Sequence, residues 1–149
     1  MSPSCGQVNK NQKNANSNSS KIEVAITDLQ KDNSDSDKYI LVFTGKNDSS
    51  KQIKMQIGKT EAEYIAIELE KMKPTAPLPL DVLEDAIKKF GYRVTEVFIY
   101  KRERDIYVSE IICKNAEREV ILNARTADAA TIGLKFNVPI YMNGDFWSK

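Results

Sequence analysis

The segment 52–69, QIKMQIGKTEAEYIAIEL, contains a change of hydrophobic periodicity that decides the fold class. Ile53, Met55 and Ile57 alternate with polar residues, which predicts a strand with one buried face that ends at Gly58. After Gly58 the apolar residues recur at helical spacing, which predicts a helix with these inward positions: Ala62, Ile65, Ala66, Leu69 and Met72. The chain therefore passes from strand to helix within a few residues.

The start of this helix has the pattern of a capping box. Thr60 precedes Glu63 by three residues, so each side chain can satisfy a free backbone N–H group of the first turn. A proline-rich segment at 74–79 interrupts the helix. A second helix is expected before Gly91, which is well placed to end it, with these inward positions: Leu83, Ala86, Ile87 and Phe90.

The same order of elements occurs again towards the C-terminus. A third helix is expected at about 127–136, with Asn137 suited to its end, and a short last strand at 138–141. Three strands precede the first helix and three precede the third, at about 22–26, 39–43, 53–57, 94–100, 106–113 and 119–122.

Folded on itself at an offset of 67 residues, the chain shows a weak internal similarity. Glu61 falls on Asp128, and Leu69 falls on Phe136. A duplicated β-β-β-α unit accounts for this similarity, and so do similar burial patterns in two unrelated halves. The element order predicts an α+β domain at 21–147, with a mixed, largely antiparallel sheet and three helices.

The composition limits the chemistry available to this domain. A chain of 149 residues is long enough for one domain with a core. It contains no histidine, which excludes Ser–His–Asp and Cys–His catalysis and His-ligated zinc. Because the net charge is only +1, any surface that binds nucleic acid must be local. Carboxylate, Lys/Arg, Tyr and hydroxyl chemistry remain, with or without a hard cation such as Mg²⁺.

Residues 1–20 are rich in Asn and Ser and predict a disordered tail. Cys5 lies in this tail and Cys113 in a predicted strand, so a disulfide is not expected and a reduced, cytoplasmic protein is favoured. No apolar run approaches the roughly 18 residues needed to cross a membrane. The alternative is lipid anchoring through Cys5, if a signal segment lies upstream of Met1.

Both strand-to-helix junctions combine a basic residue, a Thr and an acid. A helix start attracts phosphate through its free N–H groups and partial positive charge. Lys59 in the first junction and Arg125 in the second would strengthen that attraction. Glu61 and Asp128 could hold Mg²⁺ or orient a water. Acids also occur in the first turn of ordinary helices, so simple capping is the alternative for each junction.

The run 101–105, KRERD, joins two predicted strands next to Tyr100 and Tyr107. This pattern is typical of a solvated hairpin tip, and also of a tip that contacts a nucleic-acid backbone. Phe146-Trp147 near the C-terminus is expected to seal a sheet edge. The candidate substrate-binding residues of the junctions and the hairpin are Lys59, Thr126, Arg102 and Arg104.

Four short motifs carry a family resemblance. The matching residues are Gly58, Glu61 and Ala62 of a G-x-x-E-A helix start, Pro77, Leu78 and Asp81 of P-L-T-H-D, Arg125, Asp128 and Ala129 of A-R-P-S-D-A, and a closing P-I-Y at 139–141. With these motifs in order, the chain from Ile22 onward resembles the bifunctional nuclease domain, a bacterial and plant family credited with both DNase and RNase activity.

The chain departs from the family pattern at several positions. Leu80 stands where the family has a histidine, and Pro79 where it has the preceding Thr. Thr126-Ala127 replaces the Pro-Ser of the last junction, and Asn123 replaces an acid often found two residues before the Arg. Thr126 is expected to take over as N-cap one residue earlier.

The resemblance implies metal-assisted phosphodiester hydrolysis of DNA or RNA with little sequence preference. Arg125 would clamp phosphate, while Glu61 and Asp128 would position Mg²⁺ or Mn²⁺ or the attacking water. This hypothesis requires both acids to share a cleft. The lost His and Ser equivalents favour a degenerate member that binds without cutting, and the Cys5 tether favours a secreted or lipid-anchored interaction module. Exposed sheet edges would suit a homo-oligomer.

Overall fold

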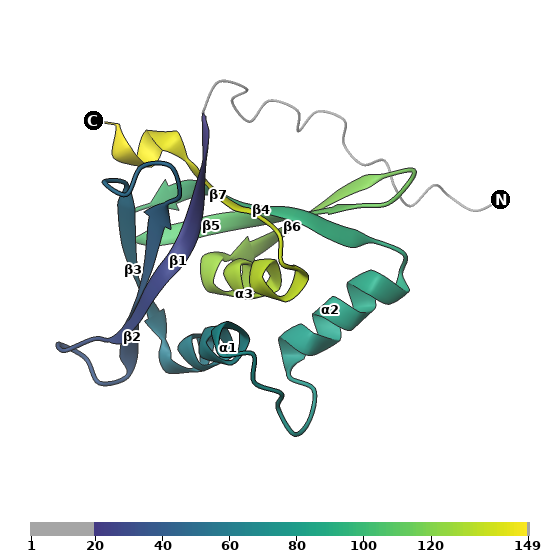
Figure 1. Cartoon of the computed structure of the whole chain (residues 1–149), viewed down its shortest axis with the longest axis horizontal. Coiled ribbons are helices and arrows are strands. Elements are labelled where there is room, and N and C mark those ends of the chain that lie inside the picture. The colour runs from purple at the N-terminus through teal and green to yellow at the C-terminus, as the bar shows by residue number, and fades with distance from the viewer. Residues whose placement is uncertain (1–19, 149) are drawn as a thin grey trace.

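Two three-stranded antiparallel meanders lie on either side of one short central strand in this protein (Figure 1). The computed structural model describes residues 20–148, so the predicted tail up to residue 19 and the proposed anchor Cys5 lie outside the described residues. The strands are β1 (Lys21–Lys31), β2 (Lys38–Gly45), β3 (Gln52–Gly58), β4 (Arg93–Glu103), β5 (Ile106–Lys114), β6 (Glu119–Arg125) and β7 (Ile140–Asn143).

The seven strands form one sheet in the order β3-β2-β1-β7-β4-β5-β6. The central strand β7 is antiparallel to β1 and parallel to β4, and every other neighbouring pair is antiparallel. The sheet is therefore mixed and largely antiparallel. Together with the helices α1 (Lys59–Leu69), α2 (Pro79–Lys89) and α3 (Thr126–Phe136), it confirms the predicted α+β class.

The two halves keep the predicted offset where each passes from strand to helix. β3 begins at Gln52 and β6 at Glu119, while α1 begins at Lys59 and α3 at Thr126, so both pairs of elements are 67 residues apart. β3 and β6 have equal lengths, and so do α1 and α3. Each half is thus three antiparallel strands followed by one helix, with α2 between the halves.

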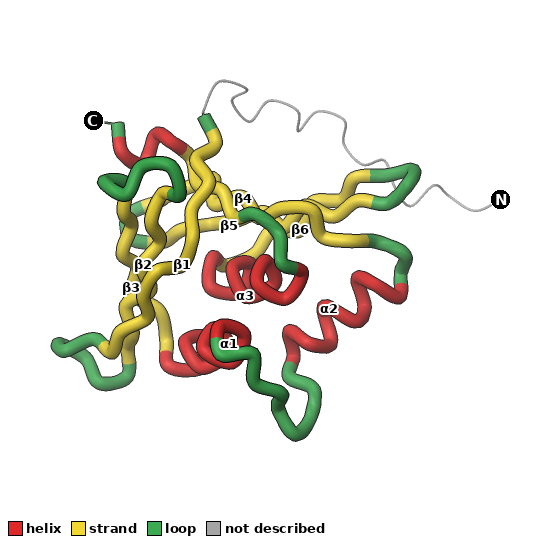
Figure 2. Tube along the Cα trace, viewed as in Figure 1, coloured by secondary structure: helices red, strands yellow, loops and turns green. Residues whose placement is uncertain are grey.

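Helix α3 packs most closely against the sheet. Its buried face is made of small and β-branched residues, and a Cβ atom at Gly133 would come within 3.2 Å of side-chain atoms of Val97 and Ile140. Gly133 therefore permits the close approach of α3 to β4 and β7. Figure 2 shows α1 beside α3, with α2 next to α3 and farther from α1.

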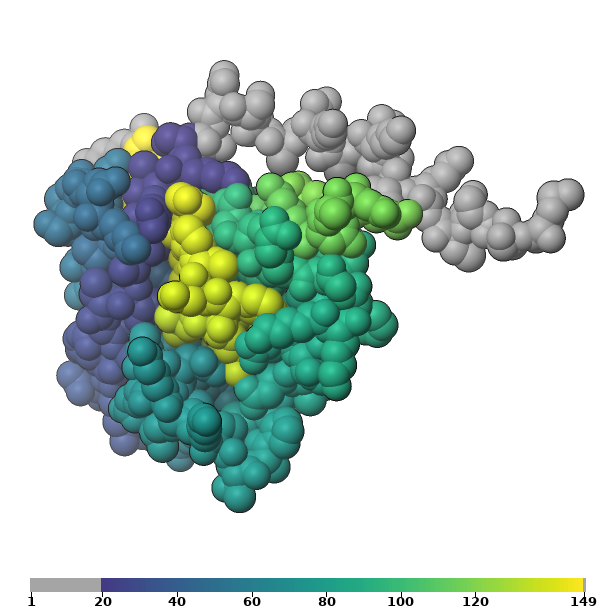
Figure 3. All heavy atoms as spheres, turned by 45° about the vertical axis from the view of Figure 1, so that its right-hand side comes forward, coloured from purple at the N-terminus to yellow at the C-terminus, as the bar shows by residue number. Residues whose placement is uncertain are grey.

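The α1–α2 loop projects from the body of the molecule (Figure 3). Helix α1 ends at Leu69, so Met72 lies beyond it, and both side chains are exposed rather than inward as predicted. Phe90 is also exposed, because it lies at the C-terminal end of α2, where the chain leaves the helix at Gly91. The helical spacing therefore failed to predict burial at the C-terminal ends of α1 and α2.

Both predicted helix caps are wrong. α1 has Gly58 as its N-cap with no side-chain cap, so Thr60 and Glu63 form no capping box. α3 has Arg125 as its N-cap, also without a side-chain cap. Thr126 instead lies in the core, where its hydroxyl is 2.7 Å from that of Ser109. The predicted helix end at Asn137 is confirmed, with the left-handed conformation that asparagine tolerates.

The last strand and the C-terminal turn differ in detail from the sequence prediction. β7 is Ile140–Asn143 rather than 138–141, and a 3-10 turn follows at Gly144–Trp147. The Trp147 indole Nε1 donates a hydrogen bond to the Gln52 carbonyl at 3.2 Å, so this turn covers part of the β3 edge as expected. Within residues 20–148, no helix has both the length and the apolar character needed to cross a bilayer.

Candidate active site where two helices begin

The two strand-to-helix junctions meet at Arg125. Its Nε atom donates to Asp128 Oδ2 at 2.8 Å and its Nη2 atom donates to Asp128 Oδ1 at 3.2 Å, which makes a two-pronged ion pair within the first turn of α3. Its Nη1 atom donates to Glu61 Oε1 at 3.1 Å, and Glu61 lies in the first turn of α1. Glu61, Arg125 and Asp128 are therefore adjacent, but Glu61 lines a cleft beside Arg125 and Asp128 does not, so the two acids do not share a cleft as the hydrolysis hypothesis requires.

The position of Glu61 depends on the residue that precedes its helix. A Cβ atom at Gly58 would collide with the Glu61 carboxylate, so only glycine leaves room for this carboxylate to lie over the start of α1. Glu61 is the third residue of α1, and its carboxylate is mostly buried. Gly58 thus fixes the orientation in which Glu61 reaches Arg125.

The charges at this junction are one guanidinium and two carboxylates. The hydrogen bond to Asp128, followed by its negative charge, raises the pKa of Arg125 above its ordinary value, so the guanidinium stays protonated. The Arg125 side chain is nevertheless 70% exposed. Ion pairs at exposed sites contribute about 0–1 kcal/mol each, so a competing anion can replace the carboxylates at small cost.

A cleft of about 220 Å³ opens beside Arg125. It lies between the C-terminal half of β3, the start of β5 and the start of α3. Its walls are mainly apolar, and they include Met55, Ile57, Ile106 and Tyr107 together with Glu61 and Arg125. Burial raises the pKa of Tyr107 above its ordinary value, so its phenol remains protonated at neutral pH.

The predicted basic hairpin lies next to this cleft. Its residues Asp105, Ile106 and Tyr107 line the cleft, whereas Arg102 lies near the end of β4 and Arg104 in the turn that follows. The Arg102 guanidinium carbon is 5.4 Å from the centroid of the Tyr107 ring. The hairpin therefore adds the acid Asp105 to the cleft wall, whereas neither of its two arginines belongs to that wall.

The other two candidate residues differ in their accessibility. Lys59 is exposed in the first turn of α1 and makes no ion pair with any described residue. Thr126 lines the cleft, but its hydroxyl is paired with Ser109 in the core. Only Lys59 has a free polar group that a ligand could reach.

The described residues offer few side-chain ligands for Mg²⁺ or Mn²⁺. Among residues 20–148 there is no group of three or more potential metal-ligating side chains. Glu61 and Asp128 offer oxygen atoms, and Mg²⁺ commonly takes only one or two carboxylates beside water and substrate phosphate. The two carboxylates therefore fit such an ion chemically, provided that Arg125 releases them.

The model of one protein family, described as the bifunctional nuclease domain, matches residues 41–149. The chain belongs to this family. Two uncharacterized proteins of Mycobacterium tuberculosis, from strains CDC 1551 and ATCC 25618, are each 33% identical to it over 86 residues. That stretch covers 58% of this chain, and it spans about half, 51%, of the length of each relative.

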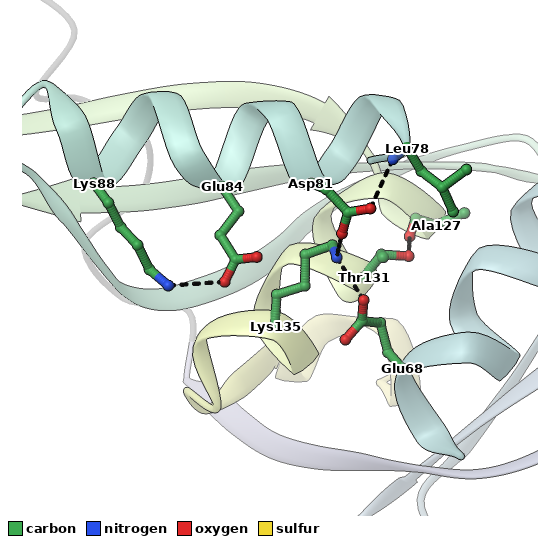
Figure 4. A network of polar contacts seen from close by, with 8 residues as sticks. All are labelled: Glu68, Leu78, Asp81, Glu84, Lys88, Ala127, Thr131 and Lys135. Carbon is green, nitrogen blue, oxygen red and sulfur yellow. Dashed lines mark hydrogen bonds and ion pairs between the residues drawn. The ribbon is translucent and has the colours of Figure 1, made fainter. Parts of the chain in front are cut away.

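A second charged cluster links the three helices of the bifunctional nuclease domain (Figure 4). The Lys135 ammonium group of α3, only 7% exposed, contacts the carboxylates of Glu68 on α1 and Asp81 on α2. Asp81 Oδ2 also accepts a hydrogen bond of 2.7 Å from the Leu78 backbone N–H group. The hydrogen bond from Lys135 is the main cause that lowers the pKa of Asp81.

Asp81 was noted in the sequence only as part of a family motif, and Lys135 was not singled out. The offset of 67 residues contained the missing signal, because it places Glu68 on Lys135 as well as Glu61 on Asp128. Glu68 of α1 and Lys135 of α3 thus occupy equivalent positions, carry opposite charges and contact each other. Glu61 and Asp128 also occupy equivalent positions, and both contact Arg125. The two clusters lie at opposite ends of α3, about 15 Å apart along an eleven-residue helix.

The departures from the family pattern divide between these two clusters. Leu80, at the family's histidine position, lines a small hollow with Asp81 and Lys135. Ala127, at the serine position, lines the cleft beside Arg125. The lost histidine is therefore remote from the cleft, whereas the lost serine removes a hydroxyl group from it.

Proposed function

We propose that the cleft beside Arg125 hydrolyses phosphodiester bonds of DNA or RNA with little sequence preference. The observation that supports this proposal is that Arg125 contacts both Glu61 and Asp128 beside a cleft that Glu61 and Arg125 line, in a bifunctional nuclease domain. Glu61 and Arg125 are 64 positions apart in the chain, so simple capping of each helix does not explain their contact.

Arg125 is the phosphate-binding residue in this proposal. Its planar guanidinium matches two oxygens of a phosphate as well as it matches the Asp128 carboxylate. When a phosphate replaces the two carboxylates at Arg125, Glu61 and Asp128 lose their shared cation. The freed carboxylates can then orient an attacking water, and the guanidinium stabilises the charge that develops on the phosphoryl oxygens.

The same carboxylates are the residues that would hold a divalent cation. Mg²⁺ or Mn²⁺ bound there would supply Lewis-acid polarisation of the phosphoryl group. Because Arg125 occupies both carboxylates in the free protein, we expect phosphate and metal binding to assist each other. The proposal needs no base-specific contacts, because phosphate contacts position a substrate without reading its sequence.

The second candidate function is binding without cleavage. It is favoured by Ala127, which leaves the cleft without the hydroxyl that the family pattern places there.

Cleavage assays on purified protein separate the two functions. Single- and double-stranded DNA and RNA are incubated with Mg²⁺ or Mn²⁺, with EDTA as the control. Arg125→Ala and Asp128→Asn are the test variants, and Arg118→Ala, an exposed arginine in the β5–β6 turn, is the matched control. We expect the first two variants to lose at least about 10²-fold in rate and the control to keep it.

The outcome is decided by the dependence on these side chains. Cleavage that persists in Arg125→Ala and Asp128→Asn would place the activity elsewhere or in a contaminant. Binding of the nucleic acids that weakens in Arg125→Ala, with no cleavage under any condition, would establish the second function instead.

A further inference from the structure

The cleft beside Arg125 has apolar walls that have no role in phosphate binding or hydrolysis. Met55 and Ile57 contribute one side from β3, while Ile106 and Tyr107 contribute the other from β5. Ile106 is 67% exposed, although it is a large apolar residue in a strand. A phosphate and two carboxylates gain nothing from such walls, so the walls point to an apolar part of the ligand.

We propose that this cleft receives one unstacked nucleobase, so that the ligand of the site is single-stranded nucleic acid. This inference rests on the proposed function, because it assigns a substrate class to the same site. A nucleotide has an apolar base beside an anionic phosphate, which matches apolar walls beside the exposed guanidinium of Arg125.

The size of the cleft separates single strands from duplexes. Its volume of about 220 Å³ lies below the roughly 300–1,000 Å³ of pockets that enclose drug-sized ligands. The space suits a single base and excludes a base pair. Bases of a duplex are already stacked on both faces, whereas those of a single strand can turn out and stack on protein side chains.

The Tyr107 wall is held in place before any ligand binds. Its ring meets the Phe146 ring edge-on, with centroids 5.5 Å apart and planes at 81°. The Arg102 guanidinium carbon lies 5.4 Å from the Tyr107 ring centroid. A rigid aromatic wall with a neighbouring cation is the combination that binds single strands without sequence preference.

Binding can be measured by fluorescence anisotropy in EDTA, where the proposed metal-dependent cleavage is suppressed. The probes are a labelled single-stranded DNA, the same strand in a duplex, and an abasic strand of equal length that keeps the phosphates. Ile106→Ala is the test variant because its side chain is exposed, and Ile121→Ala, an exposed isoleucine of β6 outside the cleft, is the matched control.

We expect the wild type to bind the single strand about tenfold more tightly than the duplex or the abasic strand. Ile106→Ala should weaken single-strand binding about fivefold or more, while the thermal midpoint of unfolding stays unchanged. Ile121→Ala should alter neither. Equal binding of the three probes, or unchanged binding by Ile106→Ala, would overturn the inference.

Cleavage rates on the same strands in Mg²⁺ or Mn²⁺ distinguish this inference from the proposed function. Cleavage of single strand and duplex at equal rates, dependent on Arg125, would keep hydrolysis and refute the base-binding cleft. Ile106-dependent binding of single strands without cleavage would keep the cleft and refute hydrolysis. The absence of both binding and cleavage would refute the two together.

Discussion

Replacement of Lys135 by methionine tests whether one buried cation holds the three helices together. Lys135 is 7% exposed, and the carboxylates of Glu68 and Asp81 that contact it are 21% and 24% exposed. Methionine keeps the unbranched shape of the side chain and removes only the charge. The substitution leaves two carboxylates facing each other without a counter-ion, at a point where α1, α2 and α3 meet (Figure 4).

The magnitude follows from the degree of burial. Removal of one partner from a fully buried pair costs about 3–5 kcal/mol, because the other charge is stranded. Both carboxylates here keep about a fifth to a quarter of their exposure and can regain water, so we expect a loss of about 2 kcal/mol. At about 2–4 °C per kcal/mol for a chain of this size, the thermal midpoint should fall by about 4–8 °C.

The matched control is Lys88→Met, four residues after its partner Glu84 in α2. Lys88 is 58% exposed, so this pair contributes at most about 0.5 kcal/mol. Urea denaturation and thermal melts of both variants give the comparison, and hydrogen exchange shows whether the amides of α2 open first in Lys135→Met. Equal, small losses for the two variants would refute the idea that Lys135 fixes α2 to the other helices.

Three further substitutions probe separate parts of the structure. Asp81→Asn should flatten the acid side of the stability profile: since its folded pKa is lowered, its contribution is present above the ordinary value of about 3.8 and disappears as the pH falls through the folded pKa. Urea denaturation at neutral and acid pH checks this, and an unchanged acid loss would contradict it. Thr126→Val should cost about 1–3 kcal/mol by leaving the buried Ser109 hydroxyl unpaired; a double variant with Ser109→Ala that recovers no stability would argue against the pairing. Gly58→Ala should lower any cleavage rate by roughly tenfold to 10²-fold, because the added Cβ displaces the Glu61 carboxylate. If Gly58→Ala lowers the rate equally in a Glu61→Ala background, the effect does not pass through Glu61.

Periodicity was sufficient to predict which segments are strands and which are helices, but not where the helices begin. Thr60 is a better N-cap by residue type than Gly58, yet α1 begins at Lys59. At Gly58 the Glu61 carboxylate occupies the space that a Cβ atom would need, and it reaches Arg125 in the other half of the chain. Local propensity contains no signal for this contact between the two halves.

The candidate site divides in the same way. Glu61, Arg125 and Asp128 could be selected from sequence because helix starts attract these residue types. The apolar cleft beside them could not be predicted from the sequence. Ile106 contributes to it from the β4–β5 hairpin, which is distant in sequence from the β3 residues of the other wall. Lys135 was missed for the same reason: its two partners lie on different helices, 67 and 54 residues away.

The two losses from the family pattern do not weigh equally on the question of activity. A histidine at the position of Leu80 would line the hollow beside Asp81 and Lys135, and this hollow shares no lining residue with the cleft beside Arg125. Its replacement by leucine keeps an apolar side chain beside a buried ion cluster and leaves the cleft unaltered. Ala127, in contrast, lines the cleft itself. Of the lost histidine and serine, the serine position is therefore the one that lies in the wall of this cleft.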